Sequence, residues 1–230
     1  MHGKQIVALG LIVCILCGCS ASTPSDAPSF VRDAPEKKPK TEALKFPVEL
    51  EYSTLIAEKV ICYQGPFWED DSGRQVEDAA ALMLYNPTDR LVEFAAFAVD
   101  TDEKTLYFFV HHLLPKSRCL VLEKNAQSCD TEHITGCREL GIRWSQNNFS
   151  PEQIDYVGLG PLMTIVNRDT RTLEHVTVHY KRYVRDGDYY LGGAVFSVHL
   201  FDLQTEERRT VRPEHYMTTD AKIVGIEVRN

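Results

Sequence analysis

The chain has 230 residues, with 25 lysines and arginines against 33 aspartates and glutamates, and a formal net charge of −8. Proteins that bind nucleic acid carry clustered positive charge, so this acidic balance argues against a nucleic-acid partner. It also argues against attraction to an anionic lipid surface, so attachment to a membrane requires another source of affinity.

The first residues have the pattern of an export signal. A polar start containing Lys4 is followed by an unbroken apolar run over residues 6–16 and then by Cys17-Gly18-Cys19. The run is shorter than the roughly 20 residues that a membrane-spanning helix needs, but it suits a secretory signal. Its end resembles the bacterial lipobox, in which the last cysteine is diacylated. We therefore expect residues 1–18 to be removed and Cys19 to become a lipid anchor; the alternative is a plain secretory signal with an incidental cysteine.

The segment that follows has the composition of a tether. Residues 19–45 are rich in proline and small or charged residues and contain almost no large apolar side chains. Such a segment cannot bury enough surface to offset the entropy of ordering it. The sequence predicts a flexible tether that holds a folded part away from the bilayer.

Four cysteines other than the anchor and signal cysteines remain: Cys62, Cys119, Cys129 and Cys137. An even number in an exported chain permits two disulfides. The last two enclose a short polar loop, which favours their pairing and leaves Cys62 to pair with Cys119. Four reduced thiols are the alternative.

Strand patterns dominate the rest of the chain. Short runs rich in aromatic and β-branched residues, bounded by turn residues such as Asn86-Pro87, predict strands. These runs cover residues 80–85, 91–99, 106–114, 119–123, 176–180 and 194–200. Since no window has a long helical period, we predict an all-β fold.

The chain also matches itself. Residues 82–86 align with residues 163–167 at a spacing of 81, and the same spacing places residues 92–93 on residues 173–174. Further on, after an insertion in the second copy, Leu114 falls on Leu203. A repeat of this length predicts two copies of a small β-domain. We place the copies at residues 46–130 and 138–230.

The repeated pattern has a known counterpart. An apolar-x-apolar-x-Asn strand end such as Leu82 to Asn86, a polar turn, an aromatic hairpin and a final strand resemble the FxLYD-like immunoglobulin-type β-sandwich. With its lipobox and its hairpin at residues 190–193, the chain resembles an uncharacterised family of tandem-domain lipoproteins of Gram-positive bacteria. The resemblance implies two tandem immunoglobulin-like β-sandwiches.

The sequence offers little evidence of catalytic chemistry. It contains no Gly-x-Ser-x-Gly, His-Glu-x-x-His or phosphate-binding glycine motif. His111 and His112 are neighbours on a predicted strand and must point to opposite faces, whereas His175 and His179 would lie about 13 Å apart. Neither pair suits a metal with ligands ~2.1 Å away. We expect no catalytic, cofactor or metal site, and we interpret the acidic turns at residues 70–73 and 100–103 as solvated rather than calcium-binding.

Phe67 and Trp68 are the best interaction candidates, because exposed aromatic residues in a loop must pack down or bind something. The sequence therefore predicts a non-enzymatic, surface-displayed binding or structural lipoprotein of the cell envelope. Its partners would be the membrane, through the anchor, and an unidentified envelope or extracellular protein. The alternatives are a cell-envelope hydrolase with an unrecognised site and, less favoured, the solute-binding lipoprotein of a transporter.

Overall fold

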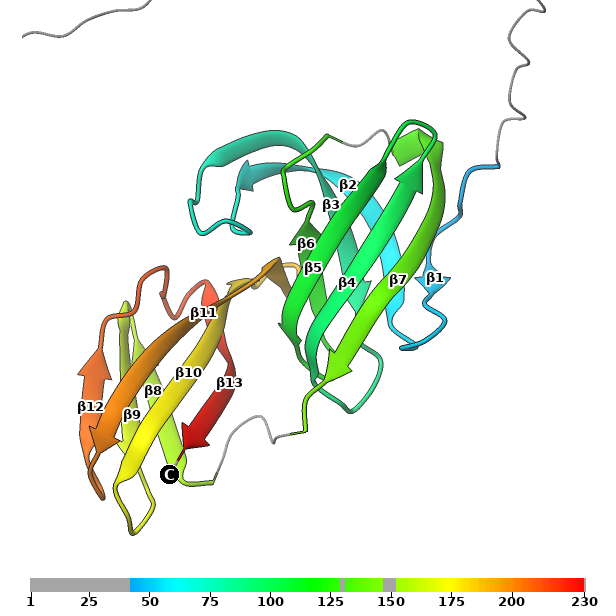
Figure 1. Ribbon diagram of the computed structural model, residues 1–230. Coiled ribbons are helices and arrows are strands. Elements are labelled where there is room, and N and C mark those ends of the chain that lie inside the picture. Colours follow the sequence, from blue (N-terminus) through cyan, green and yellow to red (C-terminus); the bar gives the residue numbers. More distant parts are fainter. Residues whose placement is uncertain (1–41, 129–130, 147–151, 230) are drawn as a thin grey trace, which may run out of the picture. The chain divides into compact units, whose positions relative to one another are not determined.

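The computed structural model describes residues 42–128, 131–146 and 152–229 (Figure 1). We call residues 42–146 the first half and residues 152–229 the second half. The first half contains β1 (Val48–Glu49), β2 (Ile56–Pro66), β3 (Gln75–Tyr85), β4 (Val92–Thr101), β5 (Thr105–Leu113), β6 (Arg118–Leu122) and β7 (Ile134–Trp144). The second half contains β8 (Ile154–Leu159), β9 (Leu162–Asn167), β10 (Leu173–Val184), β11 (Tyr189–Leu203), β12 (Arg208–Val211) and β13 (Ala221–Arg229).

The predicted all-β class is confirmed. In the described ranges the only helical element is a short 3₁₀ turn at Thr131–His133. No helix in those ranges is long and apolar enough to cross a membrane. The predicted signal, the anchor Cys19 and the tether up to residue 41 lie outside the described residues.

The strands form one seven-stranded sheet and two three-stranded sheets, an arrangement consistent with a β-sandwich. The large sheet has the order β1-β2-β3-β6-β11-β10-β13, and the small sheets have the orders β5-β4-β7 and β12-β9-β8. Neighbouring strands are antiparallel except β6 and β11, which form a short parallel ladder that pairs Cys119 with Tyr190 and Leu120 with Leu191. This ladder joins the first half to the second.

The strand pairings of the second half repeat those of the first. In the first half β3 lies between β2 and β6, and β4 lies between β5 and β7. In the second half β9 lies between β8 and β12, and β10 lies between β11 and β13. The order of pairing along the chain is therefore the same in both halves.

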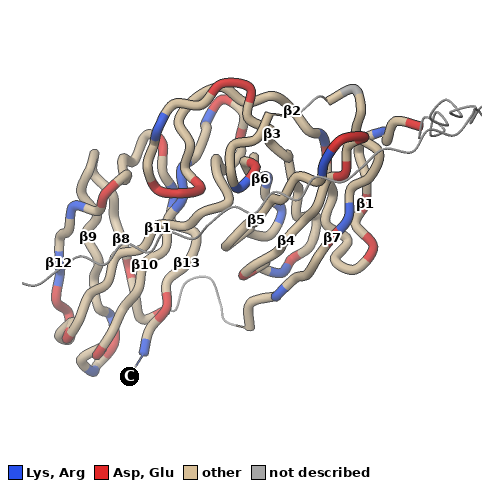
Figure 2. The backbone as a smooth tube through the Cα atoms, turned by 45° about the horizontal axis from the view of Figure 1, so that its top comes forward, with Lys and Arg blue, Asp and Glu red and all other residues tan. Residues whose placement is uncertain are grey.

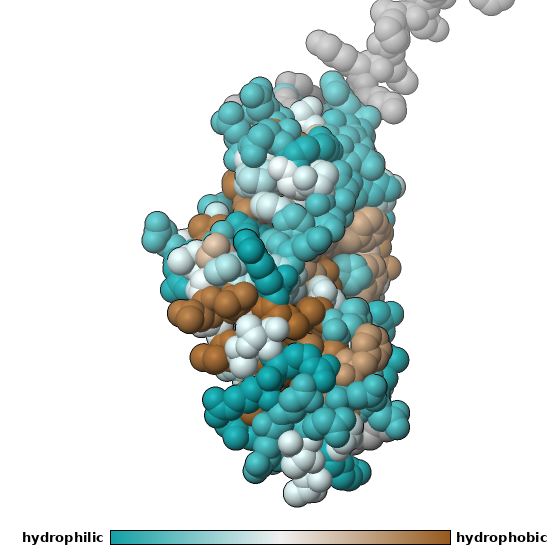
Figure 3. Space-filling model, turned by 90° about the vertical axis from the view of Figure 1, so that its left-hand side faces the viewer, coloured by the Kyte–Doolittle hydropathy of each residue, from teal (hydrophilic) through white to brown (hydrophobic). Residues whose placement is uncertain are grey.

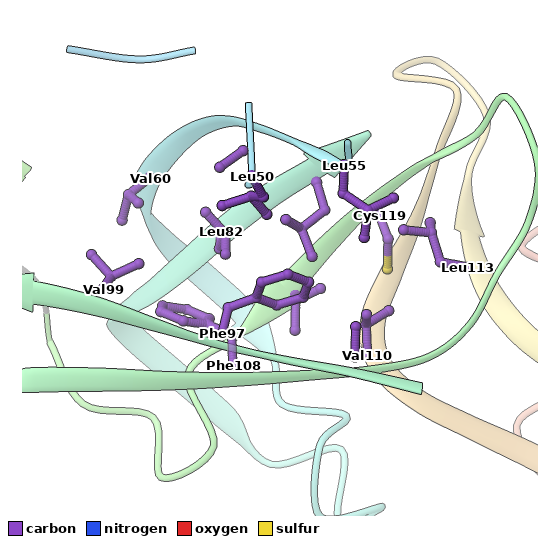
Figure 4. Packing of buried hydrophobic residues seen from close by; sticks show 14 of the residues in the cluster. Leu50, Leu55, Val60, Leu82, Phe97, Val99, Phe108, Val110, Leu113 and Cys119 are labelled. Carbon is purple, nitrogen blue, oxygen red and sulfur yellow. The ribbon is translucent and has the colours of Figure 1, made fainter. Parts of the chain in front are cut away.

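A hydrophobic core fills the space between the two sheets of the first half. Phe97 of β4 and Phe108 of β5 face Leu82 of β3, and all three are fully buried (Figure 4). Alternate residues of β5 are buried because successive side chains of a strand point to opposite faces. A second buried cluster occupies the second half, where Ile165 of β9 packs with residues such as Val178 of β10.

Two buried asparagines end equivalent strands. Asn86 follows β3, and its Nδ2 donates to the carbonyl oxygens of Arg90, Leu113 and Leu114 at 2.8, 3.3 and 3.0 Å. Asn167 ends β9, and its Nδ2 donates to the carbonyl oxygens of Arg171, Leu203 and Gln204 at 2.8, 2.9 and 3.1 Å. Each amide oxygen also accepts from the backbone two residues later. The two asparagines therefore make the same contacts from equivalent turns.

These contacts correct the predicted alignment after the insertion. Because the carbonyls of Leu113 and Leu203 occupy the same place in the two networks, Leu113 corresponds to Leu203. The sequence alignment had placed Leu114 there, one residue too far along. Residues 113 and 114 are both leucine, so the sequence alone could not distinguish which of them aligns with Leu203.

The predicted boundary between the two copies is wrong. Strand β7 pairs with β4 from Val92 to Thr101, so residues 138–144 belong with the first half rather than with the second copy. The short polar stretch before Cys137 lies between the two predicted copies, but β7 already begins there, at Ile134. The change of half instead occurs after Trp144, between β7 and β8.

Candidate functional site

Aromatic side chains cover the outer face of β5. Since Phe108 and its alternate neighbours point into the core, the residues between them face outward: Tyr107, Phe109 and His111. Phe94 of β4 lies opposite His111 in the ladder. The Phe94 ring is stacked with Phe109, with centroids 6.3 Å apart, and lies 5.0 Å from the His111 ring.

A pocket of about 390 Å³ lies beside these rings. Phe94, Phe109 and Ala194 give it a mainly apolar lining, and Glu69 and Lys124 bring opposite charges to it. Small-molecule and side-chain sites are usually apolar pockets of this size that contain a few polar groups. The pocket draws on both halves, because Ala194 belongs to β11.

Cations lie over the aromatic rings. The ammonium of Lys124 is 4.8 Å from the centroid of Tyr107 and 6.0 Å from that of Phe109. The guanidinium of Arg143 lies 5.9 Å from the Phe94 ring and pairs with Glu93 at 3.0 Å. Such contacts hold a cation at an aromatic surface, where it can also attract an anionic group. Elsewhere acidic and basic residues mix at turns and strand ends (Figure 2).

Glu69 uses its carboxylate to connect the two halves. Its oxygens accept hydrogen bonds from the backbone N–H groups of Leu122 at 2.8 Å, Gly193 at 2.8 and 2.9 Å, and Ala194 at 3.0 Å. Burial raises the pKa of Glu69, although these hydrogen bonds oppose the rise. Because the backbone engages both oxygens, Glu69 fixes the wall of the pocket rather than acting as a free base.

Lys181 is fully buried beside Glu69. Its ammonium donates to the carbonyl oxygens of His111 at 3.0 Å and Gly193 at 3.1 Å. These two carbonyls belong to β5 and β11, so Lys181 holds the edge of the aromatic face against the second half. A buried ammonium needs such partners, because its desolvation is otherwise costly.

The predicted interaction loop packs against its own chain. Phe67 is only 1 % exposed and lies in a buried cluster with Val76, so it is not available to a partner. Trp68 is partly buried, with its ring 6.3 Å from Phe196 and 4.9 Å from the guanidinium of Arg182. The prediction that Phe67 contacts a partner is therefore wrong. Trp68 mainly packs this loop onto β10 and β11.

The cysteines do not form the second predicted pair. Cys62 lies opposite Ala80 on β3, whereas Cys119 lies opposite Leu84 on the other side of that strand. A disulfide needs Cα atoms about 4.4–6.8 Å apart, which an intervening strand excludes. The Cys119 thiol is buried and donates to the carbonyl of Gly192 at 3.2 Å. The pairing of Cys137 with Cys129 remains a prediction, because Cys129 lies outside the described residues.

The acidic turns have partners within the protein. Asp70 accepts hydrogen bonds from the N–H and hydroxyl of Ser72, which lower its pKa. Asp100 accepts from Thr105 at 2.6 Å and from Arg138 at 3.1 Å. The Asp70 carboxylate therefore stabilises a turn, and the Asp100 carboxylate stabilises the end of β4.

The predicted opposite orientation of His111 and His112 is confirmed, whereas the predicted separation of His175 from His179 stays a prediction. His111 lines the aromatic pocket, while His112 lines a different pocket together with His179. His175 is four residues from His179 and bonds instead to His199, with 3.1 Å between Nε2 and Nδ1. The sequence reasoning missed the aromatic face, although the alternation in residues 105–113 places aromatic residues on both faces of that strand.

Apolar side chains also reach the surface in the second half. The exposed large apolar residues of the β8–β9 hairpin are Tyr156, Val157, Leu159 and Leu162, and Leu159 is 77 % exposed. Hydrophobic side chains gather on the face of the molecule seen in Figure 3. This hairpin provides an apolar surface against which the specificity of the aromatic pocket can be tested.

No protein family, curated protein or solved structure was found to match the chain.

Proposed function

We propose that this protein is a membrane-anchored, surface-displayed binding lipoprotein of the cell envelope without enzymatic activity. Its anchor is Cys19, and a tether carries two tandem immunoglobulin-like β-sandwiches outside the cytoplasm. The anchor rests on the lipobox pattern. The tandem sandwiches are supported by the repeated strand pairings and by the matched asparagine networks.

The observation that carries the binding function is the aromatic pocket on β4 and β5. An apolar cavity lined by Phe94 and Phe109 gains free energy when it buries an apolar group, at about 25 cal/mol per Å². Aromatic residues and arginine are also enriched at protein interfaces, and Tyr107 and Arg143 lie beside these rings. The pocket therefore suits recognition more than turnover.

The charges define the chemistry of the ligand. Lys124 places an ammonium at the aromatic rings, whereas the carboxylate of Glu69 is already engaged by backbone N–H groups. An incoming group gains most if it combines an aromatic or aliphatic side chain with a nearby carboxylate. We propose that the ligand is a segment of an envelope or extracellular protein with that composition.

Photo-crosslinking on living cells tests this function. A photo-reactive phenylalanine derivative replaces Tyr107, whose side chain faces outward beside Phe109. This replacement keeps an aromatic ring at the position. We expect one discrete crosslinked protein, and a second substitution, Phe109→Ala, should lower its yield by about tenfold or more, as for a central interface aromatic. The same probe at Leu159, in the exposed apolar hairpin, is the control.

Two results would count against the proposal. Equal yields of the same product from positions 107 and 159 would indicate adhesion to any apolar surface. A product at position 107 that survives Phe109→Ala undiminished would show that the pocket does not bind it.

A further inference from the structure

Three potential metal ligands meet at a point where the two halves touch. They are His112 of β5, His179 of β10 and Glu227 of β13, and one ligand atom from each lies within 4.8 Å of the others. The rings of His112 and His179 have centroids 4.6 Å apart. Nε2 of His179 lies 3.4 Å from Oε1 of Glu227.

The backbone arranges this convergence. His179 lies opposite Gly225 in the β10–β13 ladder, and a Cβ on Gly225 would come within 3.2 Å of the His112 ring and 3.5 Å of the His179 ring. The glycine thus leaves room for both imidazoles on one face of the sheet. Glu227 follows two residues later and so points to the same face. His112 has φ of +49°, a left-handed conformation that is unusual for a histidine within a strand.

The imidazole nitrogens have unused capacity to bind a ligand. Nδ1 of His112 is buried without a hydrogen-bond partner among the described residues, and Nε2 of His179 lies 3.4 Å from Oε1 of Glu227, at the limit of a hydrogen bond. Unpartnered buried nitrogens are costly, and native proteins seldom leave them so.

We propose that His112, His179 and Glu227 bind a divalent transition-metal ion of the zinc type. Two imidazoles and one carboxylate are a donor set that zinc accepts, with ligand atoms about 2.0–2.2 Å from the ion. Ligands at that distance in a tetrahedron lie ~3.4 Å apart. The His179–Glu227 separation already has this value, and a side-chain adjustment of the order of 1 Å brings His112 to it.

The surroundings support the same assignment. Nδ1 of His179 lies 2.7 Å from Oγ of Ser197, so this hydroxyl fixes the ring and leaves Nε2 to face the ion. Metal-binding histidines usually have such a partner on the second nitrogen. The three ligands line a pocket of about 270 Å³, which also contains Trp144. A site with three protein ligands leaves a fourth position for water or an exogenous ligand that enters through this pocket.

The sequence reasoning missed this site because it compared histidines within one strand only. His112 and His179 belong to different strands, and their contact follows from the junction of the two halves. The site is independent of the aromatic pocket, because His111 and His112 point into different pockets.

Metal titration of the full chain in detergent tests the proposal. After removal of metals with a chelator, Zn²⁺ alone is titrated by calorimetry, and Co²⁺ is used as a spectroscopic probe through its visible absorption. We expect one ion per chain, with a cobalt spectrum typical of tetrahedral nitrogen and oxygen ligands. Glu227→Gln, which keeps the shape of the side chain, should weaken zinc binding more than about tenfold, and His179→Ala should abolish it.

His175→Ala is the matched control, because His175 lies on the same strand as His179 but bonds to His199. It should bind zinc as the unmodified chain does. Absence of stoichiometric binding by the unmodified chain, or an equal loss in His175→Ala and His179→Ala, would overturn the proposal. If His179→Ala fails to fold, the comparison of Glu227→Gln with the unmodified chain decides the question.

Discussion

The two halves place different side chains on equivalent outer faces. In the first half, Phe94 lies opposite His111, Ala96 opposite Phe109, and Ala98 opposite Tyr107. At the corresponding positions of the second half, His175 lies opposite Phe201, Thr177 opposite His199, and His179 opposite Ser197. Phe94 and Phe109 of the first half thus correspond to histidines in the second half, and His111 corresponds to a phenylalanine.

The inner positions changed far less than the outer ones. The asparagine networks keep the same three acceptors, and the inner residues of β4 and β10 remain buried and mostly apolar. Core positions are constrained by packing density, whereas the outer face of a strand is free to take on a function. The shared framework therefore carries an aromatic face in the first half and a histidine-rich face in the second.

The largest effect is expected where the halves touch. A Cβ on Gly193 would lie 1.7 Å from the carbonyl oxygen of Phe109, so Gly193→Ala must push β11 away from β5. We expect a loss of about 3 kcal/mol or more in the free energy of unfolding, measured with urea. Gly141→Ala is the control, because a Cβ there has no neighbour within 4 Å. Equal effects of the two substitutions would contradict the close approach of the halves.

The asparagines should be equally important in both halves. Asn86→Ala and Asn167→Ala each leave buried carbonyl oxygens without their donor. An unsatisfied buried group costs about 1–3 kcal/mol, so we expect each variant to lose about 2–3 kcal/mol of stability to urea. Asn125→Ala, at an exposed position, should change little. A large loss in one half and none in the other would show that the two turns are not equivalent.

Strand alternation and the repeated Asn pattern were enough to predict the all-β class and the paired turns. The boundary between the halves was not predictable, because the polar outer residues of β7 resemble a linker until their pairing with β4 is known. The histidine–glutamate cluster was hidden for a similar reason. Its members are separated widely in sequence, and only the ladder between β10 and β13 and the junction with β5 bring them together.

The smallest effect on stability is expected from the ion pair between Asp100 and Arg138 at the surface of the first half. Burial opposes ionisation of Asp100, but the hydrogen bond from Thr105 and the guanidinium of Arg138 outweigh it and lower the pKa. A lowered folded-state pKa stabilises the fold above the unfolded value near 3.9, and this stability is lost as the pH falls through the folded pKa. Because the pair is partly exposed, Asp100→Asn should cost less than about 1 kcal/mol at pH 7.

Urea unfolding at two pH values measures this contribution. The difference between Asp100→Asn and the unmodified chain should shrink once the pH falls below the lowered pKa, where both side chains are uncharged. A difference that grows as the pH falls would contradict the assignment.

The position of Asp100 in the first half corresponds to that of Lys181 in the second half. Lys181 is buried and donates to two carbonyl oxygens, so the Asp100–Arg138 pair has no equivalent at that position.

We infer that the two halves share a framework, whereas the aromatic face proposed to bind a partner is specific to the first half. A single exchange tests it: the triple variant Phe94→His, Phe109→His and His111→Phe gives the first half the outer side chains of the second. Its yield of crosslinked partner from the photo-reactive residue at position 107 is then measured on cells. We expect the triple variant to unfold at nearly the same urea concentration as the unmodified chain but to capture at least about tenfold less of the partner. Undiminished capture by the triple variant would contradict it.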